Sequence, residues 1–157
     1  MALALDFLSA HDMAVIATCT VDRAPECALV AYAAKGAALI VGTDEDTRKY
    51  ENLRHLPRVA LVIGWEGPTT LQYEGEATEL RGAAADEHAA LLFTRHPEAA
   101  VFLSGPLART FLVAPRWLRY TDYSGPIPAI FELRFPAVSD GLSGPPRRPS
   151  ARRREAP

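Results

Sequence analysis

The sequence is poor in the residues that define several large classes of protein. Its 157 residues include two cysteines, Cys19 and Cys27, which are too few for a disulfide scaffold and lack the spacing of zinc ligands. They lie on either side of an expected hairpin turn, so we interpret them as neighbouring, reduced and buried thiols. No metal site is predicted, because the histidines have no mutual spacing suited to a metal ion. Surface positions are expected for His11, His55, His88 and His96.

Long hydrophobic runs are also absent. No apolar segment approaches the roughly 20 residues of a membrane-spanning helix, and the first residues lack a basic region and a small-residue cleavage site. We therefore expect a cytoplasmic protein with no membrane partner. The composition, 48% hydrophobic and 23% charged, is that of a globular domain with enough chain to bury a core. No residue stands in a pattern that marks a general acid or base, so no catalytic residue is predicted.

Charge is distributed unevenly along the chain. The whole sequence has a net charge of -2. The segment from residue 140 onward holds five arginines against two acidic residues, a net of +3, which leaves -5 for the body. An acidic body argues against a nucleic-acid-binding surface. We expect residues 1–138 to form one domain and the Pro-, Gly-, Ser- and Arg-rich residues 139–157 to be disordered.

Alternation and turn residues predict a mainly β chain with short helices. Leu71, Tyr73 and Gly75 alternate with polar residues, as in a strand with one buried face. A strand at residues 109–123 is expected to be broken by Pro115. Six or seven strands at hairpin spacing predict an antiparallel sheet that closes into a small barrel. The other strands are expected at residues 13–20, 26–33, 37–41, 58–65, 69–80 and 127–135, and short helices near the N-terminus and at residues 83–94 and 98–103.

A further helix, expected at residues 44–55, is the most informative segment. Asp44 or Asp46 is a suitable N-cap, and Arg48 and Lys49 fall in the first turn. The N-terminus of a helix has positive partial charge, so each cation there is unfavourable by a few tenths of a kcal/mol. A bound anion would reverse that sign, because free backbone N–H groups and both cations would converge on it. The alternative is a solvated helix face.

The order of these motifs resembles that of the pyridoxamine 5'-phosphate oxidase-like FMN-binding split-barrel proteins. The shared order is a hydrophobic hairpin, a strand ending in a small residue and threonine, a T-R-K turn, a helix with N-L, and a P-R-V-A-L strand. The resemblance covers roughly residues 5–135. The matching segments are residues 25–32, Gly42-Thr43, Thr47-Arg48-Lys49, Asn52-Leu53 and residues 57–61, with residues 75–80 fitting the long strand that follows.

The resemblance implies a six- to seven-stranded antiparallel split β-barrel that forms a homodimer, with FMN in the clefts between the subunits. By this likeness the T-R-K turn would hold the cofactor phosphate, the second strand would run along the ring, and two further threonines would add polar contacts. A guanidinium, an ammonium and a hydroxyl suit a phosphate dianion. The implied cofactor-binding residues are Ala28, Leu29, Val30, Thr43, Thr47, Arg48, Lys49 and Thr70.

The resemblance does not extend to the substrate site of the oxidases. Enzymes that oxidise pyridoxamine phosphate have basic residues on the second strand and an Arg- and His-containing C-terminal signature, whereas this chain has Ala28 and Ala33 and no such signature. We therefore do not expect that reaction. The prediction is a flavin-dependent oxidoreductase acting on an unidentified small molecule, with hydride chemistry supplied by the flavin. Two alternatives stay open: a deazaflavin-dependent reductase, and a flavin- or haem-binding carrier or sensor.

Overall fold

Antiparallel strands form most of the structure, a computed structural model that describes residues 1–136. The tail that we predicted to be disordered begins at residue 139 and lies outside the described residues. The alternation expected of the long strand is present, since Leu71, Tyr73 and Gly75 are buried between exposed Gln72 and Glu74. The strands are β1 Met13–Cys19, β2 Pro25–Lys35, β3 Ala38–Asp44, β4 Arg58–Ile63, β5 Thr69–Glu79, β6 Ala108–Asp122 and β7 Ala129–Arg134.

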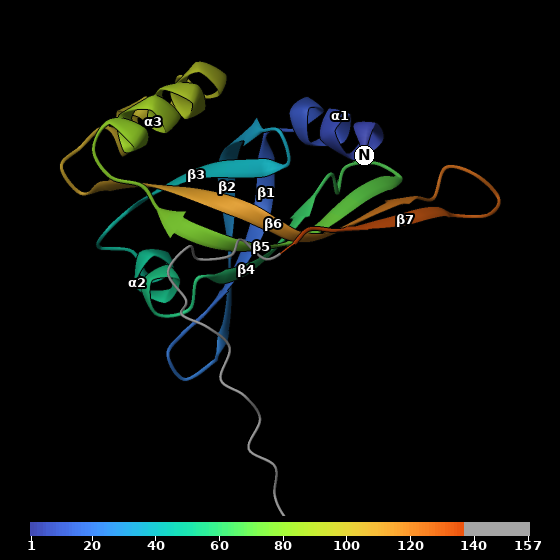
Figure 1. The fold of residues 1–157 in the computed structure, drawn as a ribbon, viewed down its shortest axis with the longest axis horizontal. Helices are drawn as coiled ribbons and strands as arrows, with labels where there is room; N and C mark the ends of the chain where they lie inside the picture. The colour runs from blue at the N-terminus through green and yellow to red at the C-terminus, as the bar shows by residue number, and fades with distance from the viewer. Residues whose placement is uncertain (137–157) are drawn as a thin grey trace, which may run out of the picture.

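The sheet closes on itself. Its strand order is β3-β2-β1-β4-β5-β6-β7, and β3 also pairs with β6. Six antiparallel strands therefore form a barrel, and β7 extends from the outer edge of β6 (Figure 1). Closure removes most of the unpaired strand edges that would otherwise attract other chains. The predicted mainly β, antiparallel split barrel is confirmed.

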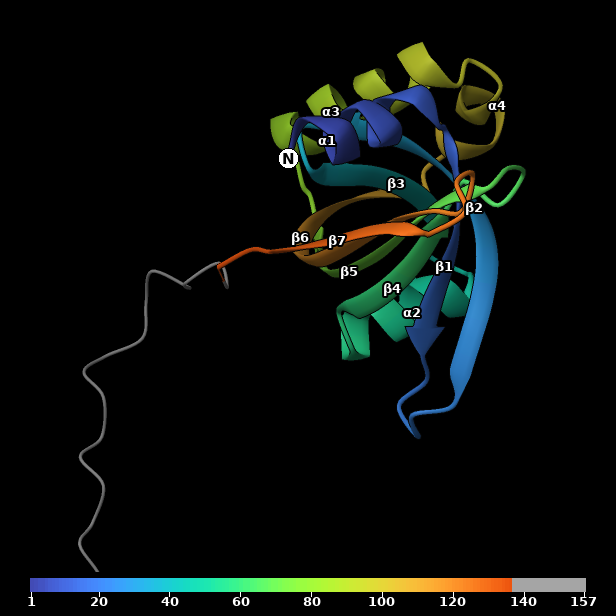
Figure 2. The same ribbon diagram turned by 90° about the vertical axis from the view of Figure 1, so that its right-hand side faces the viewer.

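Four short helices accompany the strands within the described residues: α1 Ala2–Ala10, α2 Arg48–His55, α3 Ala83–Arg95 and α4 Ala99–Leu103. Helices α1, α3 and α4 lie on one side of the barrel, and α2 lies on the opposite side beside the β1–β2 hairpin (Figure 2). In the part of the chain that the structure describes, no helix has the length and hydrophobicity needed to cross a membrane.

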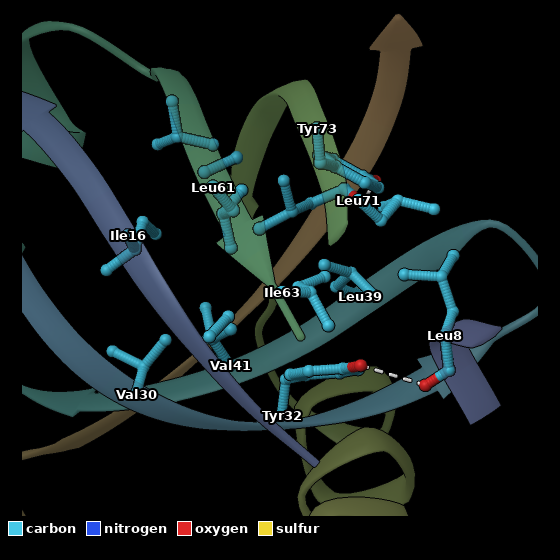
Figure 3. Close-up of a cluster of buried hydrophobic side chains, with 14 of the residues drawn as sticks. Leu8, Ile16, Val30, Tyr32, Leu39, Val41, Leu61, Ile63, Leu71 and Tyr73 are labelled. Carbon is cyan, nitrogen blue, oxygen red and sulfur yellow. Dashed lines mark hydrogen bonds between the residues drawn. The ribbon is translucent and has the colours of Figure 1, made fainter. Parts of the chain in front are cut away.

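Apolar side chains from all the barrel strands meet in one core (Figure 3). The hydroxyl groups of two tyrosines donate hydrogen bonds to backbone carbonyls inside this core. The hydroxyl of Tyr32 donates to the carbonyl of Leu8 at 2.8 Å and so ties α1 to β2, and that of Tyr73 donates to Val113 at 2.8 Å. Burial raises the pKa of both phenols, so they remain protonated donors.

The expected break at Pro115 is wrong. Strand β6 runs through it, and the pairing with β5 shifts register between Glu74 and Gly75, so that Arg116 is the extra residue of a bulge. A Cβ at Gly75 would lie 2.8 Å from the carbonyl oxygen of Ala114 and 2.7 Å from side-chain atoms of its neighbours. Because a bulge bends a strand and increases its twist, the proline is accommodated where the barrel curves.

The N-cap of α2 was also predicted at the wrong residue. Asp44 ends β3, and Thr47 caps the helix by accepting a hydrogen bond from the backbone N–H of Tyr50 at 3.2 Å. The hydroxyl of Thr47 also donates to the carbonyl of Asp44 at 2.8 Å. The helix therefore begins at Arg48.

Two expectations about burial need correction as well. Cys27 is exposed and Cys19 is partly exposed, because both side chains point outward on the β1–β2 hairpin. His88 and His96 are buried rather than on the surface. A ring nitrogen of His96 lies 3.0 Å from the carbonyl of Tyr32, which joins the end of α3 to the sheet.

Candidate functional site

Helix α2 begins at the point where strand β3 leaves the barrel, and two threonines fix this junction. Thr43 is 4% exposed at the end of the inward face of β3. Its hydroxyl oxygen lies 2.8 Å from that of Thr47. With Thr47 capping the helix and bonding back to Asp44, the direction of α2 is set by local hydrogen bonds. The first turn of the helix consequently faces the β1–β2 hairpin.

A pocket of about 490 Å³ lies between this first turn and the hairpin. It brings together four of the residues that the sequence analysis assigned to a cofactor: Ala28 from β2, the helix cap Thr47, and the cations Arg48 and Lys49. On β2, Cys27 and Ala28 contribute small side chains to the lining, and Glu26 contributes a carboxylate. The residues that line the pocket are Thr18, Glu26, Cys27, Ala28, Thr47, Arg48 and Lys49.

The two cations of the pocket differ in their surroundings. The side chain of Arg48 is 81% exposed, and its guanidinium forms an ion pair with the carboxylate of Glu26. Lys49 is partly buried, and the loss of water around its ammonium group lowers its pKa. A negatively charged ligand would compensate that loss of hydration.

The other four predicted residues do not line this pocket. Thr43 lies beneath Thr47 with its hydroxyl engaged there. On β2, Leu29 points outward and is 58% exposed, whereas the side chain of Val30 enters the core. Thr70 lies on β5, where it pairs with Thr121 of β6. A role for these four in binding a cofactor stays a prediction.

Three residues that line the site were not predicted from the sequence. Glu26 is 17% exposed, and its Oε2 accepts a hydrogen bond from the side-chain amide of Asn52 at 2.8 Å. The same amide donates to the hydroxyl of Thr18 at 3.0 Å. The third residue, Cys27, is the neighbour of Glu26 and points to the opposite face of β2. The register of the hairpin, with Thr18 opposite Glu26, is the signal that would have placed these side chains together.

A shallow apolar groove of about 270 Å³ adjoins the pocket on the outer face of the barrel. Cys27 is the residue that the linings of the two hollows share. Val62, in the groove, is 39% exposed. The groove is lined by Val15, Ala17, Cys27, Ala60, Leu61, Val62, Gln72, Tyr73, Glu74 and Trp117.

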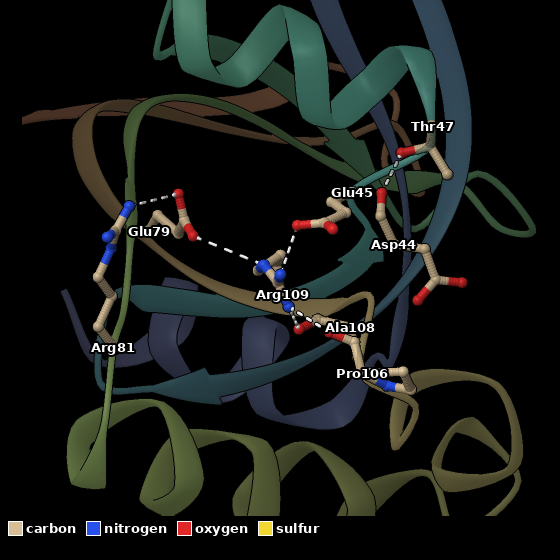
Figure 4. A network of polar contacts seen from close by, with 8 residues as sticks. All are labelled: Asp44, Glu45, Thr47, Glu79, Arg81, Pro106, Ala108 and Arg109. Carbon is tan, nitrogen blue, oxygen red and sulfur yellow. Dashed lines mark hydrogen bonds and ion pairs between the residues drawn. The ribbon is translucent and has the colours of Figure 1, made fainter.

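A larger hollow of about 730 Å³ lies at the end of the barrel under α3, and its chemistry does not suit an anion. Its central cation, Arg109, lies between Glu45 and Glu79 and donates to the carbonyls of Pro106 and Ala108 at 2.9 and 2.7 Å (Figure 4). The guanidinium is thus already surrounded by acceptors. The candidate site is therefore the pocket of about 490 Å³ between the first turn of α2 and the β1–β2 hairpin.

In residues 1–136 no group of three or more His, Cys, Asp or Glu side chains is arranged to hold a metal ion. Three of the histidines have ring nitrogens next to backbone carbonyls. The distances are 2.9 Å from His11 to Phe7, 2.8 Å from His88 to Ala84, and 3.0 Å from His96 to Tyr32.

The chain is similar to known proteins in sequence and in fold. A sequence model described as pyridoxamine 5'-phosphate oxidase matches residues 2–121. No curated protein gave a significant match to the sequence.

Several solved structures share the fold. A heme binding protein from Mycobacterium smegmatis superposes with a TM-score of 0.73 at 16% identity over 83% of this chain, which spans 56% of that protein's length. HutZ, a heme storage protein from Vibrio cholerae, gives 0.65 at 16% identity, covering 73% of this chain and 89% of that one. General Stress Protein 26 from Bacillus anthracis superposes with a TM-score of 0.62 at 18% identity, and the match covers 82% of this chain and 94% of that protein. At these identities the likeness establishes the fold.

Proposed function

The chain belongs to the pyridoxamine 5'-phosphate oxidase family, and on this premise we propose that it is a flavin-binding protein whose cofactor phosphate lies in the pocket beside α2. FMN is the leading candidate, and an oxidoreductase acting on a small molecule is the proposed activity. The observation that supports this most directly is the pocket of about 490 Å³ in which Thr47, Arg48 and Lys49 meet at the start of a helix.

The donors of this pocket fit a phosphate group. The backbone N–H groups of the first helical turn have no partner within the helix, and their partial positive charge favours an anion. The guanidinium of Arg48 lies at the mouth of the pocket, and burial holds the pKa of Lys49 below its usual value. In our proposal an arriving phosphate restores the lost stabilisation of Lys49, while Ala28 leaves room for it on β2.

The apolar groove next to Cys27 is the proposed place for the flat part of the cofactor. It shares Cys27 with the phosphate pocket and is lined mainly by residues of β1, β4 and β5. When bound, a flavin supplies hydride chemistry of its own. The chain's residues would orient the ring and exclude water, and no side chain in the pocket is required as an acid or base.

A second subunit would complete the site. On the outer barrel face Leu29 and Val62 are exposed and Trp117 is partly exposed, and we propose that a second subunit covers these apolar side chains. We infer a homodimer through this face. Val62→Glu is expected to convert the dimer to monomers in analytical ultracentrifugation, whereas Val101→Glu, at an exposed valine on α4, is expected to leave it dimeric.

Haem is a second candidate because two structural neighbours are named as heme proteins. Among residues 1–136, no histidine lines the pocket beside α2, so the flavin assignment remains first. A deazaflavin with a phosphate-bearing tail is the third candidate for the same pocket. The absorption spectra of these three chromophores differ, so one measurement separates them.

The experiment is to purify the protein, record its absorption spectrum and then titrate it with FMN, haem and a deazaflavin. We expect the absorbance of about one bound flavin per subunit. The double variant Arg48→Ala, Lys49→Ala is expected to lose this bound flavin. The control is Arg54→Ala, which removes an exposed cation from the same helix outside the pocket. A colourless protein that ignores added FMN would refute the proposal, and a haem spectrum alone would replace it.

A further inference from the structure

Glu26 places a fixed negative charge inside the pocket where a phosphate is proposed to bind. Its carboxylate extends from β2 to α2 and contacts two side chains of that helix. Oε2 accepts from the amide of Asn52 at 2.8 Å, and the other oxygen meets the guanidinium of Arg48. Asn52 is 4% exposed and is also bonded to Thr18 at 3.0 Å. The carboxylate is therefore held in position rather than free to move away from the pocket.

The charges of the lining residues determine which anion the pocket suits. Of the seven lining residues, Arg48 and Lys49 are cationic and Glu26 is anionic at neutral pH, a balance of +1. A phosphomonoester such as the phosphate of FMN has nearly two negative charges at pH 7, because its second pKa is about 6. A phosphodiester has one. A dianion must therefore compete with Glu26 for the guanidinium of Arg48 and is repelled by the carboxylate twice as strongly as a monoanion.

We propose that Glu26 is a specificity-determining residue that shifts the preference of this pocket from doubly charged phosphomonoesters towards singly charged phosphodiesters. The proposal rests on the proposed function, since it concerns the same pocket, and it states how that pocket discriminates between two classes of phosphate ester. A flavin-type molecule whose side chain continues beyond its phosphate presents a phosphodiester, whereas FMN ends in a phosphomonoester. Glu26 therefore reduces the advantage that the second negative charge of FMN would otherwise give it over a phosphodiester ligand.

The substitution Glu26→Gln separates this role from a structural one. Glutamine has the same shape, and its side-chain oxygen can still accept the hydrogen bond from Asn52, so the link between β2 and α2 is retained. Only the negative charge is lost. Glu51→Gln is the matched control. Glu51 is an exposed carboxylate on α2, and its side chain does not line the pocket.

The test compares dissociation constants of three flavins, measured by fluorescence quenching, in the wild-type protein and both variants. The probes are riboflavin, which is neutral, riboflavin 4',5'-cyclic phosphate, a phosphodiester monoanion, and FMN, the phosphomonoester. Each ligand is compared with itself across proteins, so differences in shape between ligands cancel. Thermal melting of the apo proteins checks that Glu26→Gln is folded.

The expected result is a graded response to ligand charge. An electrostatic energy is proportional to the charge of the ligand. Glu26→Gln should therefore leave the dissociation constant of riboflavin unchanged, lower that of the cyclic ester roughly threefold and lower that of FMN roughly tenfold. Glu51→Gln should change all three by less than about twofold.

Other outcomes overturn the proposal in distinguishable ways. If flavins bind but Glu26→Gln leaves the affinity for FMN unchanged, weakens it, or alters all three ligands equally, the selectivity role is wrong and the flavin site stands. If no flavin binds to any of the proteins, the proposed function is wrong and the role of Glu26 in it falls as well.

Discussion

The closed barrel and the corner where α2 meets the β1–β2 hairpin are built in opposite ways. Side chains inside the barrel are apolar and almost completely buried, and the hydroxyls of Tyr32 and Tyr73 are paired with carbonyls. The corner instead gathers a carboxylate and two cations around a hollow. The first arrangement stabilises the fold through burial. The second leaves charges partly dehydrated, as sites that bind a ligand commonly do.

The largest expected effect is in the barrel. Leu71 is completely buried, so Leu71→Ala should lower the free energy of unfolding by about 3 kcal/mol, the range for a buried leucine that leaves a cavity. Chemical denaturation of the apo protein measures this. Arg48→Ala, at an 81% exposed side chain, should change the same quantity by less than about 0.5 kcal/mol. Equal losses would mean that the corner supports the fold as the barrel does.

Asn52 lies at the boundary between the two regions. Asn52→Leu would leave Glu26 and Thr18 without the amide that now binds both, and an unpaired buried polar group costs about 1–3 kcal/mol. We expect a loss near the middle of that range in denaturation experiments. The exposed neighbour provides the control, since Glu51→Ala should be close to neutral. A neutral Asn52→Leu would show that Glu26 does not depend on this contact.

A smaller effect is expected from one hydroxyl in the core. Tyr73→Phe removes hydrogen bonds to the carbonyls of Val113 at 2.8 Å and Ala37 at 3.1 Å and keeps the ring. The expected loss is about 1 kcal/mol of unfolding free energy, the usual net value of a buried hydrogen bond. A much larger loss would indicate that these bonds fix the closure of the barrel near β3 and β6.

The smallest expected effect has the opposite sign. Burial lowers the pKa of Lys49, so the unfolded chain binds that proton more tightly than the folded one. Stability of the apo protein should therefore rise with pH between the lowered folded pKa and the unfolded value of about 10.4. Lys49→Gln should remove this dependence and stabilise the apo protein by roughly 0.5 kcal/mol at pH 7. Lys35→Gln, which removes a surface pair with Glu87, should not stabilise it.

The same contrast explains how far the sequence alone could lead. The barrel follows from local patterns, because alternation in β5 and the hairpin spacings are visible in single segments. Pro115 misled the analysis because a proline at a bulge and a proline that ends a strand look alike in sequence. The difference depends on the neighbouring strand, where Gly75 leaves the space.

The corner was predicted in part for a similar reason. Arg48 and Lys49 lie in one motif next to a helix start, so their meeting at a pocket was visible in the sequence. Glu26 precedes them by more than twenty residues, and its approach to Arg48 depends on the register of β1 and β2 and on the direction of α2. The charge balance of the pocket is thus a property of the fold, beyond the reach of a local motif.

The central claim is that Arg48 and Lys49 hold the phosphate of a flavin. The most direct test is the ratio of the dissociation constants of riboflavin and FMN, because the two ligands differ only in that phosphate. We predict that the wild-type protein binds FMN at least about tenfold more tightly, a difference of about 1.4 kcal/mol, and that Arg48→Ala, Lys49→Ala brings the ratio close to one. An unchanged ratio in the double variant would contradict the claim.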